Sequence, residues 1–382
     1  MKNNVHIYPS TILFESRIFK IARTISNLDI YDNIIILGIN NGKLPETEVI
    51  EKNIAIKRLG IEELSWAKQG ILRKIINVTN LSIQTFKYLI KVKPEVVHAH
   101  NLASLPVSVI YKIFYKSKVV YDTHEIETER QGWSFFQRMI SKLFELFFIR
   151  FVDITVVVND AIADLYRKWY KVSVVSIYNA PEDLNLDVQN NYFREKYNIK
   201  DQTKIFVYIG VLTENRGVIK YANFAKKTDL DICFIFIGFG EGQQIIENLA
   251  QDSEKIFIHE PVKQNVLRQL IGSADYSLQT LSFDNNLSLS YKLALGNKFF
   301  ECCAAQLPMI AGGYDLWDDF IKNYSIGVTI ENDNFESIEN GIVKLLSMDF
   351  SLIKKNCKKV STKYNWENES IKIINYYKEN IL

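Results

Sequence analysis

The chain lacks a cysteine framework, a net charge and a long apolar run, and each absence excludes a class of protein. Its four cysteines show neither Cys-x-x-Cys nor Cys/His spacing, so we expect reduced thiols rather than disulfides or a zinc finger. The 46 basic and 44 acidic residues leave a formal charge of +2, which is too balanced for binding nucleic acid through the overall field. No apolar run reaches the ~18 residues that a membrane-spanning helix needs.

The first residues, MKNNVHIYPS, also lack the basic-then-apolar pattern of a secretory signal and run directly into an apolar strand pattern. We therefore expect a cytoplasmic protein. Hydrophobic residues make up 47% of the chain and charged residues 24%, as is usual for a globular protein. The length of 382 residues exceeds the ~250 to 300 at which a single core usually stops growing, which predicts two domains.

Short β-branched segments alternate with longer amphipathic segments, a pattern typical of βα repeats and a parallel sheet. In the first half the expected strands are 5–8, 33–39, 54–58, 95–98, 119–122, 154–158 and 174–178. The expected helices between them include 16–26, 70–92, 134–151 and 161–170. A second set of expected strands comprises 204–209, 232–238, 256–259, 276–281, 308–311 and 327–330.

The pattern pauses at 179–183 and in the polar stretch up to residue 201, where we place a linker. Two βα sets joined by a linker predict an α/β fold of two Rossmann-like, doubly wound domains that face each other across a cleft. We expect an N-terminal acceptor domain at 1–182 and a C-terminal donor domain at 183–365. Ligands should bind at the carboxyl ends of the strands.

The segment 296–311 is the most informative for chemistry. Gly296 directly precedes an amphipathic helix, so free backbone N–H groups and the positive end of the helix dipole would attract an anion such as a diphosphate. Glu301 lies about one turn into that helix, where its carboxylate could accept hydrogen bonds from two ribose hydroxyls. A solvated glutamate favoured by the helix dipole is the alternative interpretation of Glu301.

The pattern N-K-x-x-E-x-x-A-x-x-x-P-x-I begins at Asn297 and ends at Ile310. It resembles the donor-binding signature of retaining GT-B glycosyltransferases of the family 4 type, and the resemblance extends over nearly the whole chain. It implies a nucleotide-diphosphate sugar as donor, with UDP as the commonest carrier, and neither a metal nor a cofactor. It also implies that Glu301 binds ribose and that the amides around Asn297 and Lys298 hold phosphate, with Phe299 in the same donor site.

Family members often carry a second glutamate eight positions earlier, and this chain has Leu293 there. The half of the motif that contacts the sugar therefore lacks its carboxylate. Contacts to the donor sugar would then come from backbone amides and from neighbours such as Ser288, Ser290 or Tyr291. A non-catalytic scaffold subunit is an alternative that Leu293 keeps open.

A strand pattern that ends at Gly210 is followed by Arg216 and Gly217 at the start of the next helix. An arginine there can pair with the β-phosphate and offset charge on the leaving group, the task that a metal performs in other transferases. Arg216 resembles the basic residue that the family uses for phosphate, and Lys220 is a second cation nearby. A surface arginine in a turn is the alternative.

Gly238 and Gly240 form a glycine-rich turn after another apolar strand. In this location the turn resembles the family's G-x-G near the nucleotide, where missing side chains let the backbone approach the ligand. A simple tight turn accounts for the same glycines equally well.

Polar residues also follow a strand in the first half, in the segment Asp122-Thr123-His124-Glu125. This segment resembles the family's strand end whose histidine lies beside the donor sugar and the reacting centre. His124 is therefore the candidate for positioning donor and acceptor, and Glu125 or Glu127 could orient the acceptor hydroxyl. A histidine satisfied at a strand end is the alternative.

His98 and His100 point the same way if their strand continues, and two such histidines can bind zinc. No third ligand has suitable spacing, so we expect no metal and a cleft-lining or structural role for both. His100, Ser16 and Arg17 are further candidates for phosphate or acceptor contacts. A helix cap is the favoured interpretation of Ser16.

The segment 133–150 combines large aromatic residues with Arg138, Lys142 and Arg150. Such a helix could lie in a membrane interface or pack in the core. Polysaccharide-building relatives often act on lipid-linked acceptors, so peripheral contact with the cytoplasmic membrane face stays open. The segment 366–382 resembles the family's terminal helix, which crosses back onto the N-terminal domain.

The predicted reaction is sugar transfer to a saccharide or lipid-linked saccharide acceptor, with His124, Arg216 and Glu125 as catalytic candidates. Retention at the anomeric carbon is implied by the resemblance alone. Arg216 and the helix start at Asn297 would stabilise the departing diphosphate. A scaffold subunit and a UDP-sugar 2-epimerase of the same architecture are the alternatives, and an epimerase needs no acceptor.

Overall fold

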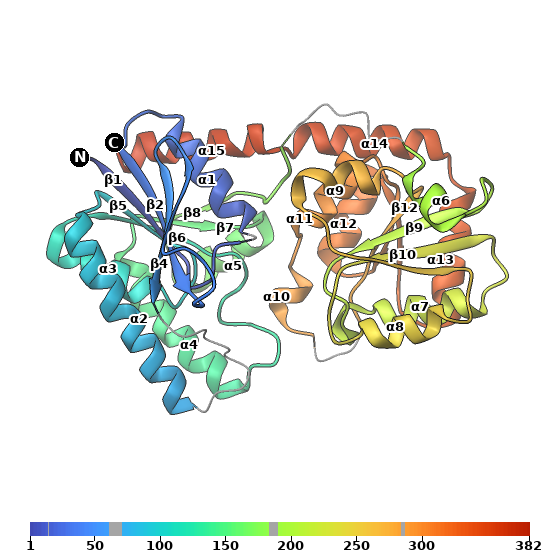
Figure 1. The fold of residues 1–382 in the computed structure, drawn as a ribbon, viewed down its shortest axis with the longest axis horizontal. Helices are drawn as coiled ribbons and strands as arrows, with labels where there is room; N and C mark the ends of the chain where they lie inside the picture. The colour runs from blue at the N-terminus through green and yellow to red at the C-terminus, as the bar shows by residue number, and fades with distance from the viewer. Residues whose placement is uncertain (14, 61–70, 183–189, 284–286) are drawn as a thin grey trace. The chain divides into compact units, whose positions relative to one another are not determined.

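A computed structural model describes residues 1–13, 15–60, 71–182, 190–283 and 287–382 of the chain. The described residues divide into two units (Figure 1). The N-terminal unit comprises Met1–Asn179 and Asn368–Leu382, and the C-terminal unit comprises Ala180–Glu367. The boundary that the sequence predicts at residue 182 lies within a few residues of this division.

The N-terminal unit is built on one sheet with the strand order β3-β4-β2-β1-β5-β6-β7-β8 among its described residues. The strands are β1 (Asn3–Ile7), β2 (Asn33–Asn40), β3 (Thr47–Glu51), β4 (Ile54–Gly60), β5 (Val96–Ala99), β6 (Lys118–Asp122), β7 (Ile154–Val157) and β8 (Val174–Ser176). The helices are α1 (Ser16–Ser26), α2 (Ile71–Val92), α3 (Leu105–Tyr115), α4 (Phe135–Phe148), the 3-10 turn η1 (Ile149–Phe151), α5 (Asp160–Tyr170) and α15 (Trp366–Asn380). All strand pairs are parallel except β3 with β4.

Local sequence explains most of these elements. Apolar residues recur at Ile18, Ile21, Ala22 and Ile25, so α1 buries one face. The strand β1 is buried along its whole length, as is typical of a central parallel strand. The edge strand β3 is absent from the expected elements because its alternating, charged sequence contains no apolar run.

The C-terminal unit has a parallel sheet with the described strand order β11-β10-β9-β12-β13-β14. The strands are β9 (Lys204–Ile209), β10 (Ile232–Ile237), β11 (Ile256–His259), β12 (Tyr276–Gln279), β13 (Met309–Gly312) and β14 (Gly327–Ile330). The helices are α6 (Tyr192–Tyr197), the 3-10 turn η2 (Glu214–Arg216), α7 (Val218–Lys227), α8 (Gln243–Ala250), α9 (Gln264–Ile271), α10 (Leu289–Lys292), α11 (Asn297–Ala304), α12 (Asp315–Tyr324), α13 (Phe335–Ser347) and α14 (Phe350–Lys363).

The expected strands agree closely with the structure. The segments predicted for β9, β11 and β14 match at both ends, and the other predicted strands overlap their observed counterparts. The polar stretch interpreted as a linker contains α6, while its residues 183–189 lie outside the described part of the chain. The first residue of the predicted helix 70–92 also lies outside it, and α2 begins at Ile71.

Each sheet has a switch point, where the chain changes the direction in which it adds strands. In the N-terminal unit this point lies between β1 and β5, and in the C-terminal unit it lies between β9 and β12. Doubly wound folds bind ligands at the carboxyl ends of the strands beside such a point. These two places are therefore where functional side chains are expected.

The helix α15 ties the end of the chain to the N-terminal unit. Tyr377 is fully buried, and its hydroxyl accepts a hydrogen bond from Asn4 Nδ2 at 2.7 Å. The carboxylate of Glu369 accepts a hydrogen bond from the backbone N–H of Tyr178 at 2.8 Å. These contacts bury polar groups with partners, as stable packing requires.

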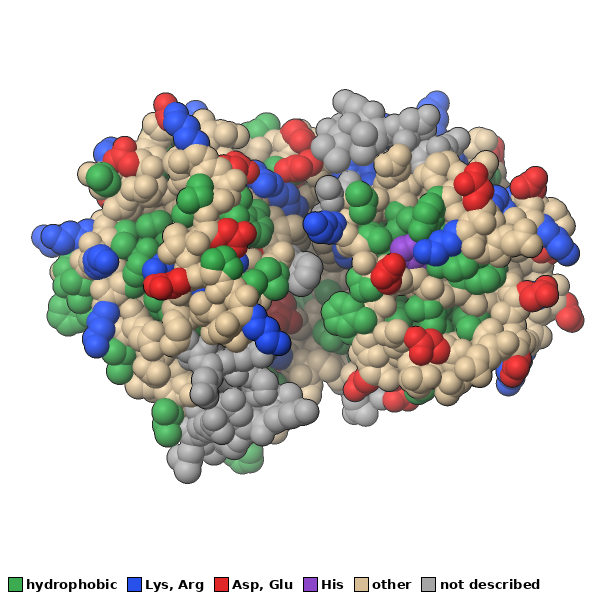
Figure 2. Space-filling view, viewed as in Figure 1, with side chains coloured by type: hydrophobic (Ala, Val, Ile, Leu, Met, Phe, Trp, Pro, Cys, Tyr) green, Lys and Arg blue, Asp and Glu red, His purple; other side chains and the backbone are tan. Residues whose placement is uncertain are grey.

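Acidic and basic side chains are interspersed on the face shown in Figure 2. All four cysteines are buried free thiols. Within the described residues, every helix is too short or too polar to cross a membrane.

Candidate functional site

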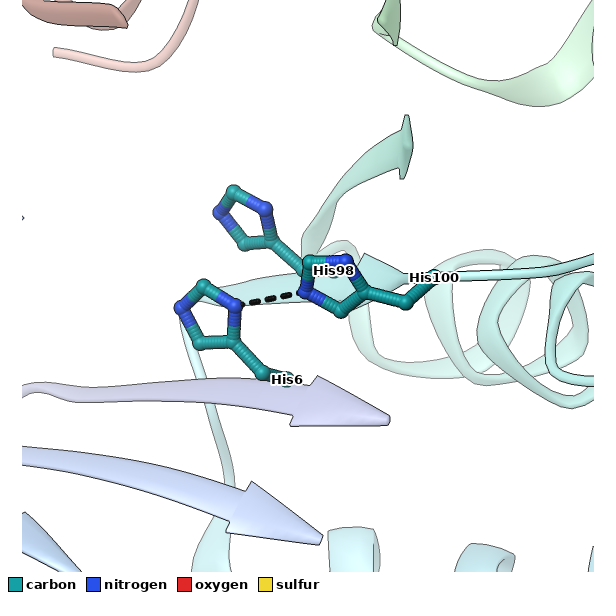
Figure 3. A group of neighbouring side chains, drawn as sticks. All are labelled: His6, His98 and His100. Atoms are coloured by element: carbon teal, nitrogen blue, oxygen red, sulfur yellow. Dashed lines mark hydrogen bonds between the residues drawn. The ribbon is translucent and has the colours of Figure 1, made fainter. Parts of the chain in front are cut away.

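Three histidines gather at the switch point of the N-terminal unit (Figure 3). The parallel register of β1 and β5 places His6 opposite His98, and His100 follows β5. The rings of His6 and His98 stack with centroids 4.2 Å apart, and His6 Nδ1 lies 2.8 Å from His100 Nε2 in a hydrogen bond. Burial lowers the pKa of His6 and His98 well below the ordinary value, so both rings are neutral at pH 7.

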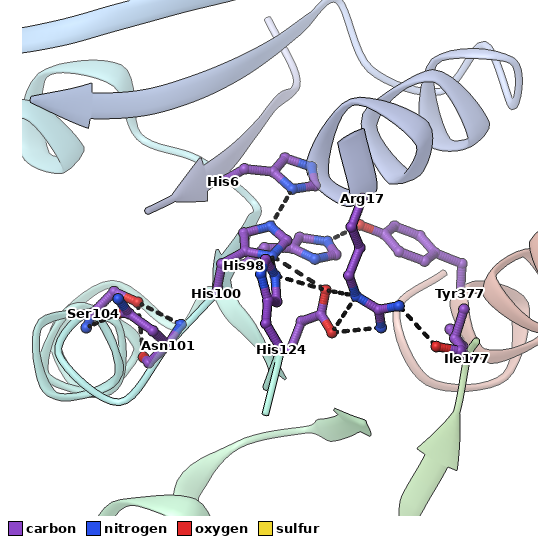
Figure 4. Close-up of polar contacts among 10 residues, drawn as sticks. His6, Arg17, His98, His100, Asn101, Ser104, His124, Ile177 and Tyr377 are labelled. Atoms are coloured by element: carbon purple, nitrogen blue, oxygen red, sulfur yellow. Dashed lines mark hydrogen bonds and ion pairs between the residues drawn. The ribbon is translucent and has the colours of Figure 1, made fainter. Parts of the chain in front are cut away.

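A buried ion pair lies beside the stacked histidines (Figure 4). Arg17 Nη2 lies 2.7 Å from Asp122 Oδ1, and Arg17 Nη1 donates to the carbonyl of Ile177 at 2.7 Å. His100 Nδ1 lies 3.2 Å from Asp122 Oδ2. Burial alone would raise the pKa of Asp122, but Arg17 and the neighbouring histidines hold it well below the ordinary value. The carboxylate is therefore ionised and fixed in place.

The structure corrects two interpretations of the helix α1. Arg17 is only 3% exposed and directs its guanidinium at Asp122, so it holds the N-terminal unit together rather than facing a phosphate. Ser16 is the first residue of α1, and the position before it belongs to Glu15, which makes no side-chain cap. The helix cap expected of Ser16 is therefore wrong.

His124 is the member of this group that reaches the surface. Its ring stacks on Tyr8 with centroids 5.2 Å apart, and its Nε2 lies 3.2 Å from His100 Nδ1. Its side chain is 22% exposed, whereas that of His100 is fully buried. Burial lowers the pKa of His124 to about 3, so it can meet a ligand as a neutral hydrogen-bonding group but not as a cation.

Two carboxylates beyond His124 share one arginine. Arg130 Nε lies 3.0 Å from Glu125 Oε1, and Arg130 Nη2 lies 2.8 Å from Glu127 Oε2. Glu127 is buried and also accepts a hydrogen bond from the backbone N–H of Leu102 at 3.1 Å. Burial raises the pKa of Glu127 to about 7, against the lowering effect of Arg130. A carboxyl group that titrates near neutrality suits proton transfer. Glu127 is therefore a better candidate than the more exposed Glu125 for the group that orients the acceptor hydroxyl and exchanges its proton.

Two groups of described side chains bring three metal-ligating atoms within 4.8 Å of one another, namely His6, His98 and His100, and His100, Asp122 and His124. The expectation that no third ligand lies near His98 and His100 is therefore wrong. In the first group the stacked rings lie in nearly parallel planes, so their lone pairs do not converge on one point. In the second group Asp122 already pairs with the guanidinium of Arg17, whose charge repels a metal ion.

Two glycine-containing loops pack tightly together beyond β9 and β10. Gly238 has a φ of +152°, and a Cβ added there would lie 1.8 Å from the carbonyl oxygen of Gly210. Gly240 has a φ of +158°, and its added Cβ would lie 2.4 Å from the carbonyl oxygen of Leu212. Only glycine fits both positions. Packing between the two loops thus explains these glycines without a ligand.

Arg216 and Tyr291, two donor-site candidates from distant segments, meet near the switch point of the C-terminal unit. The guanidinium carbon of Arg216 lies 4.7 Å from the centroid of the Tyr291 ring, a cation–π geometry. Burial raises the pKa of neighbouring Tyr208 to about 12, while Arg216 lowers it and Tyr291 raises it. The arginine therefore has an aromatic support, unlike an ordinary surface arginine.

The second expected cation has a different environment. Lys220 is largely exposed, and its Nζ lies 4.0 Å from Asp333 Oδ1. The loops after β9 and β12 do meet beside Arg216, because Ser282 N donates to the carbonyl of Asn215 at 3.0 Å. Arg216 is thus the candidate that the switch-point loops position.

The helix α11 begins at Asn297 with Gly296 at its N-cap, as the sequence predicts. Glu301 is 3% exposed, and its Oε2 lies 3.4 Å from Arg268 Nε, so the interpretation as a solvated glutamate is wrong. Burial lowers the pKa of Lys298. The side chain of Phe299 packs in the aromatic core instead of lining a donor site.

The short helix α10 precedes this segment. The hydroxyl of Ser288 caps it by accepting a hydrogen bond from Tyr291 N at 3.3 Å. Ser290 is buried, and Leu293 follows the last residue of the helix. The cap fixes the start of the turn that carries Tyr291.

Several residues of these sites escaped the sequence analysis. His6 carried a usable signal, since a lone histidine in an apolar central strand needs a buried partner. Tyr208, Arg268 and Tyr377 carried none, because their partners lie on elements that the chain brings together only in the fold.

Two family models match the chain over residues that together exceed half of its length. The model described as "Glycosyl transferases group 1" matches residues 189–364, and the model described as "Glycosyltransferase Family 4" matches residues 63–180. The chain belongs to the GT-B glycosyltransferases of the family 4 type.

Solved GT-B structures share the fold of this family member. Sucrose-phosphate synthase from Thermosynechococcus elongatus gives a TM-score of 0.79 at 13% identity, covering 99% of each chain. Anabaena Alr3699/HepE in complex with UDP-glucose gives 0.73 at 12% identity, covering 99% of this chain and 100% of that one. The E. coli structure titled trehalose-6-phosphate, bound with UDP-2-fluoro glucose, gives 0.73 at 12% identity over 99% of each chain.

A curated sequence is also similar to this GT-B chain. The uncharacterized glycosyltransferase MJ1607 of Methanocaldococcus jannaschii is 26% identical over 237 residues. The match covers 55% of this chain and 58% of the relative, so it spans less than two thirds of the relative's length.

Proposed function

We propose that this chain transfers a sugar from a nucleotide-diphosphate sugar, with UDP as the favoured carrier, to a saccharide or lipid-linked saccharide acceptor. The transfer retains the anomeric configuration and needs neither a metal ion nor a cofactor. The observation that carries the proposal is Arg216 held over Tyr291 near the switch point of the C-terminal unit. A cation positioned there can pair with a diphosphate where doubly wound folds bind their ligands.

In this proposal Arg216 acts on the leaving group. Negative charge grows on the diphosphate as its bond to the sugar breaks, and a guanidinium can form two parallel hydrogen bonds to it. The first backbone N–H groups of α11, beginning at Asn297, add a second favourable field. Such fixed groups supply the charge stabilisation for which other transferases use a metal.

Glu301 has the proposed role of binding the ribose hydroxyls. The buried contact with Arg268 Nε at 3.4 Å orients its carboxylate, which suits a hydrogen-bond acceptor. The same contact would also explain the buried position of Glu301 if this residue only stabilised the fold. The experiment therefore includes a substitution of Glu301 that preserves its shape.

In the N-terminal unit, His124 is proposed to position the sugar and the acceptor as a neutral hydrogen-bonding group. The contacts with Tyr8 and His100 restrict its ring to one orientation. Glu127, with its pKa of about 7, is the proposed partner for the proton of the acceptor hydroxyl, with Glu125 beside it.

UDP is favoured as the carrier because two solved structures with this fold are titled as complexes with UDP-glucose and UDP-2-fluoro glucose. The proposed place of action is the cytoplasm. Peripheral contact with the inner membrane face would follow where the acceptor is lipid-linked.

The test begins with donor binding. Thermal unfolding of the full chain is measured with UDP, GDP, ADP and TDP sugars, each with and without EDTA. We expect stabilisation by one nucleotide series, unchanged by EDTA, strongly reduced in Arg216→Met and weakened in Glu301→Gln. Glu336→Gln, a substitution at an exposed position of α13, is the matched control and should leave the stabilisation unchanged.

Turnover is then measured with the binding donor across saccharide and lipid-linked acceptors. NMR of the product gives the anomeric configuration directly. An inverted product would overturn retention, and activity lost to EDTA and restored by a divalent ion would overturn metal independence. Donor binding without any transfer would favour the scaffold alternative that Leu293 keeps open. A changed sugar nucleotide without acceptor would identify an epimerase.

A further inference from the structure

The helix α4 of the N-terminal unit has the reverse polarity of an ordinary surface helix. Its one acidic residue, Glu145, is fully buried and accepts hydrogen bonds from the hydroxyls of Tyr121 at 2.5 Å and Tyr166 at 3.0 Å, and also from Tyr170. Surface helices normally bury an apolar stripe and expose their charges. Here polar contacts anchor the helix from inside, and its apolar side chains face outward.

The outward stripe runs the length of α4. Phe136, Ile140, Leu143 and Phe147 recur at helical spacing and are 58 to 68% exposed, and Phe135 beside them is 75% exposed. Isolated exposed apolar residues are common on proteins, but a contiguous row of large ones marks an interaction site. Packing against the described residues does not explain this row, since these side chains stay mostly exposed and lie on the side away from Glu145.

The neighbouring helices extend the apolar surface. The helix α3 packs against both α2 and α4, and it exposes Ile113 and Phe114. The helix α2 adds exposed Ile76 and Ile83. Three adjacent helices thus present large apolar side chains to solvent.

Every exposed charge among the described side chains of these three helices is positive. The sequences of α2 and α3 contain no Asp or Glu, and the only carboxylate of α4 is buried. The basic residues with described side chains are Lys87, Lys91, Lys112, Arg138 and Lys142. Glu129 pairs with Arg138 and Lys142, and Asp153 pairs with Lys112, but these two carboxylates are mostly buried.

We propose that α4, together with the outer faces of α3 and α2, docks on a lipid bilayer that contains anionic phospholipid. Phenylalanine and leucine side chains bordered by lysine and arginine are typical of helices that lie in the plane of a membrane interface. Anionic headgroups attract the cations, and the acyl boundary accepts the aromatic rings. The 14 residues of α4 are too few to cross the bilayer, so the helix lies along it.

This surface adds a partner to the proposed function, and its lipid binding can be measured without any sugar donor. Flotation of the full chain is compared on vesicles of phosphatidylcholine alone and of phosphatidylcholine with phosphatidylglycerol. The stripe variant carries Phe136→Gln, Ile140→Gln and Leu143→Gln. The control variant carries Val343→Gln, Leu352→Gln and Ile371→Gln, which replace similarly exposed apolar residues outside the three helices.

We expect the wild type and the control variant to float with the anionic vesicles, to bind the neutral vesicles weakly, and to lose binding as salt rises. The stripe variant should bind about a hundred-fold more weakly, because three apolar groups no longer leave water. Unchanged melting temperature and donor binding in that variant would separate lipid docking from folding and from the transferase proposal. A wild type that stays off anionic vesicles, or a stripe-dependent dimer in sedimentation without vesicle binding, would overturn the proposal.

Discussion

The two units of this chain have different kinds of side chains at the switch points of their sheets, buried and paired in one unit and partly exposed in the other. At the switch point of the N-terminal unit, stacked neutral histidines and the Arg17–Asp122 pair are buried together away from water. At that of the C-terminal unit, Arg216 is only partly buried and rests on Tyr291. In the N-terminal unit the opposite charges pair with each other, whereas in the C-terminal unit the positive charge of Arg216 stays available for a ligand.

This difference shows that the place where functional side chains gather and the role that they perform have separate causes. A doubly wound sheet fixes where functional side chains gather, but the loop residues decide whether they hold the unit together or meet a ligand. Substitutions at the buried pair should therefore change stability first. Substitutions at Arg216 should change donor use first, with little effect on folding.

The largest expected effect is the loss of stability in Asp122→Asn. The amide leaves Arg17 as a buried charge without its counterion, and breaking such a pair costs about 3 to 5 kcal/mol. Urea unfolding of the full chain measures this change. The loss should be larger at neutral pH than at strongly acidic pH, because the depressed pKa of Asp122 stabilises the native state only while the carboxylate is ionised.

The control is the double variant Arg17→Met/Asp122→Leu, which removes both charges from the same place. It should recover most of the lost stability, since an apolar pair of similar size can replace a buried ion pair. If the double variant were as unstable as the sum of the single variants, the two residues would act independently and the comparison between the two units would lose its basis.

The next effect concerns Arg216→Met, which should reduce kcat with the identified donor by about 10² to 10³-fold, as expected for loss of a group that stabilises the departing charge. Its melting temperature without ligand should change little, because the side chain is partly exposed. Lys220→Met is the matched control, since Lys220 is a nearby, largely exposed cation that pairs with Asp333. Equal losses in both variants would contradict a specific role of Arg216.

Glu127 offers a pH test within the N-terminal unit. Its native pKa of about 7 exceeds the ordinary value of 4.5, so it adds stability at low pH that is lost as the pH rises through 7. Glu127→Gln cannot ionise, and its stability relative to wild type should therefore rise by roughly 3 kcal/mol between pH 4 and pH 8. Denaturant midpoints at several pH values measure the trend.

Glu125→Gln serves as the control for that pH dependence because Glu125 contacts the same arginine from a more exposed position. It should show no comparable rise. A flat difference between wild type and Glu127→Gln would mean that Glu127 has the same pKa in the folded and unfolded states, which would remove the basis of its proposed role with the acceptor proton.

Sequence alone predicted the sheet cores because buried strands carry unbroken apolar runs. Strand β10 is the plainest case, with every residue buried. The prediction failed at β3, an edge strand with charged residues, and at α6, a short helix within a polar stretch. Neither segment needs an apolar run, so neither carries the signal on which the prediction depended.

The site residues divide in the same way. Glu301 and Arg216 were found because each lies in a local motif beside a helix start. The partners Arg268 and Tyr291 are placed by the three-dimensional fold, as is the pairing of His6 with His100 across β1 and β5. Strand order depends on long-range contacts, which a single sequence does not reveal. The pairing of β1 with β5 brings His6 beside His98 and His100 as a third potential metal ligand, which the analysis of sequence spacing missed.

The smallest expected effect is a change in donor affinity on replacing Tyr291, whose ring supports Arg216. Tyr291→Leu keeps an apolar support but removes the π-face, a contact worth about 1 kcal/mol when partly desolvated. Donor affinity measured by calorimetry should fall by roughly three- to ten-fold, since 1.4 kcal/mol corresponds to a factor of ten. Tyr192→Leu is the matched control, because Lys196 lies 5.5 Å from that ring on a helix with no proposed donor contact. Tyr291→Phe retains the π-face and should bind the donor like wild type. A loss as large as that of Tyr291→Leu would assign the effect to the tyrosine hydroxyl instead. Arg216 would then be held in place by some other part of the C-terminal unit.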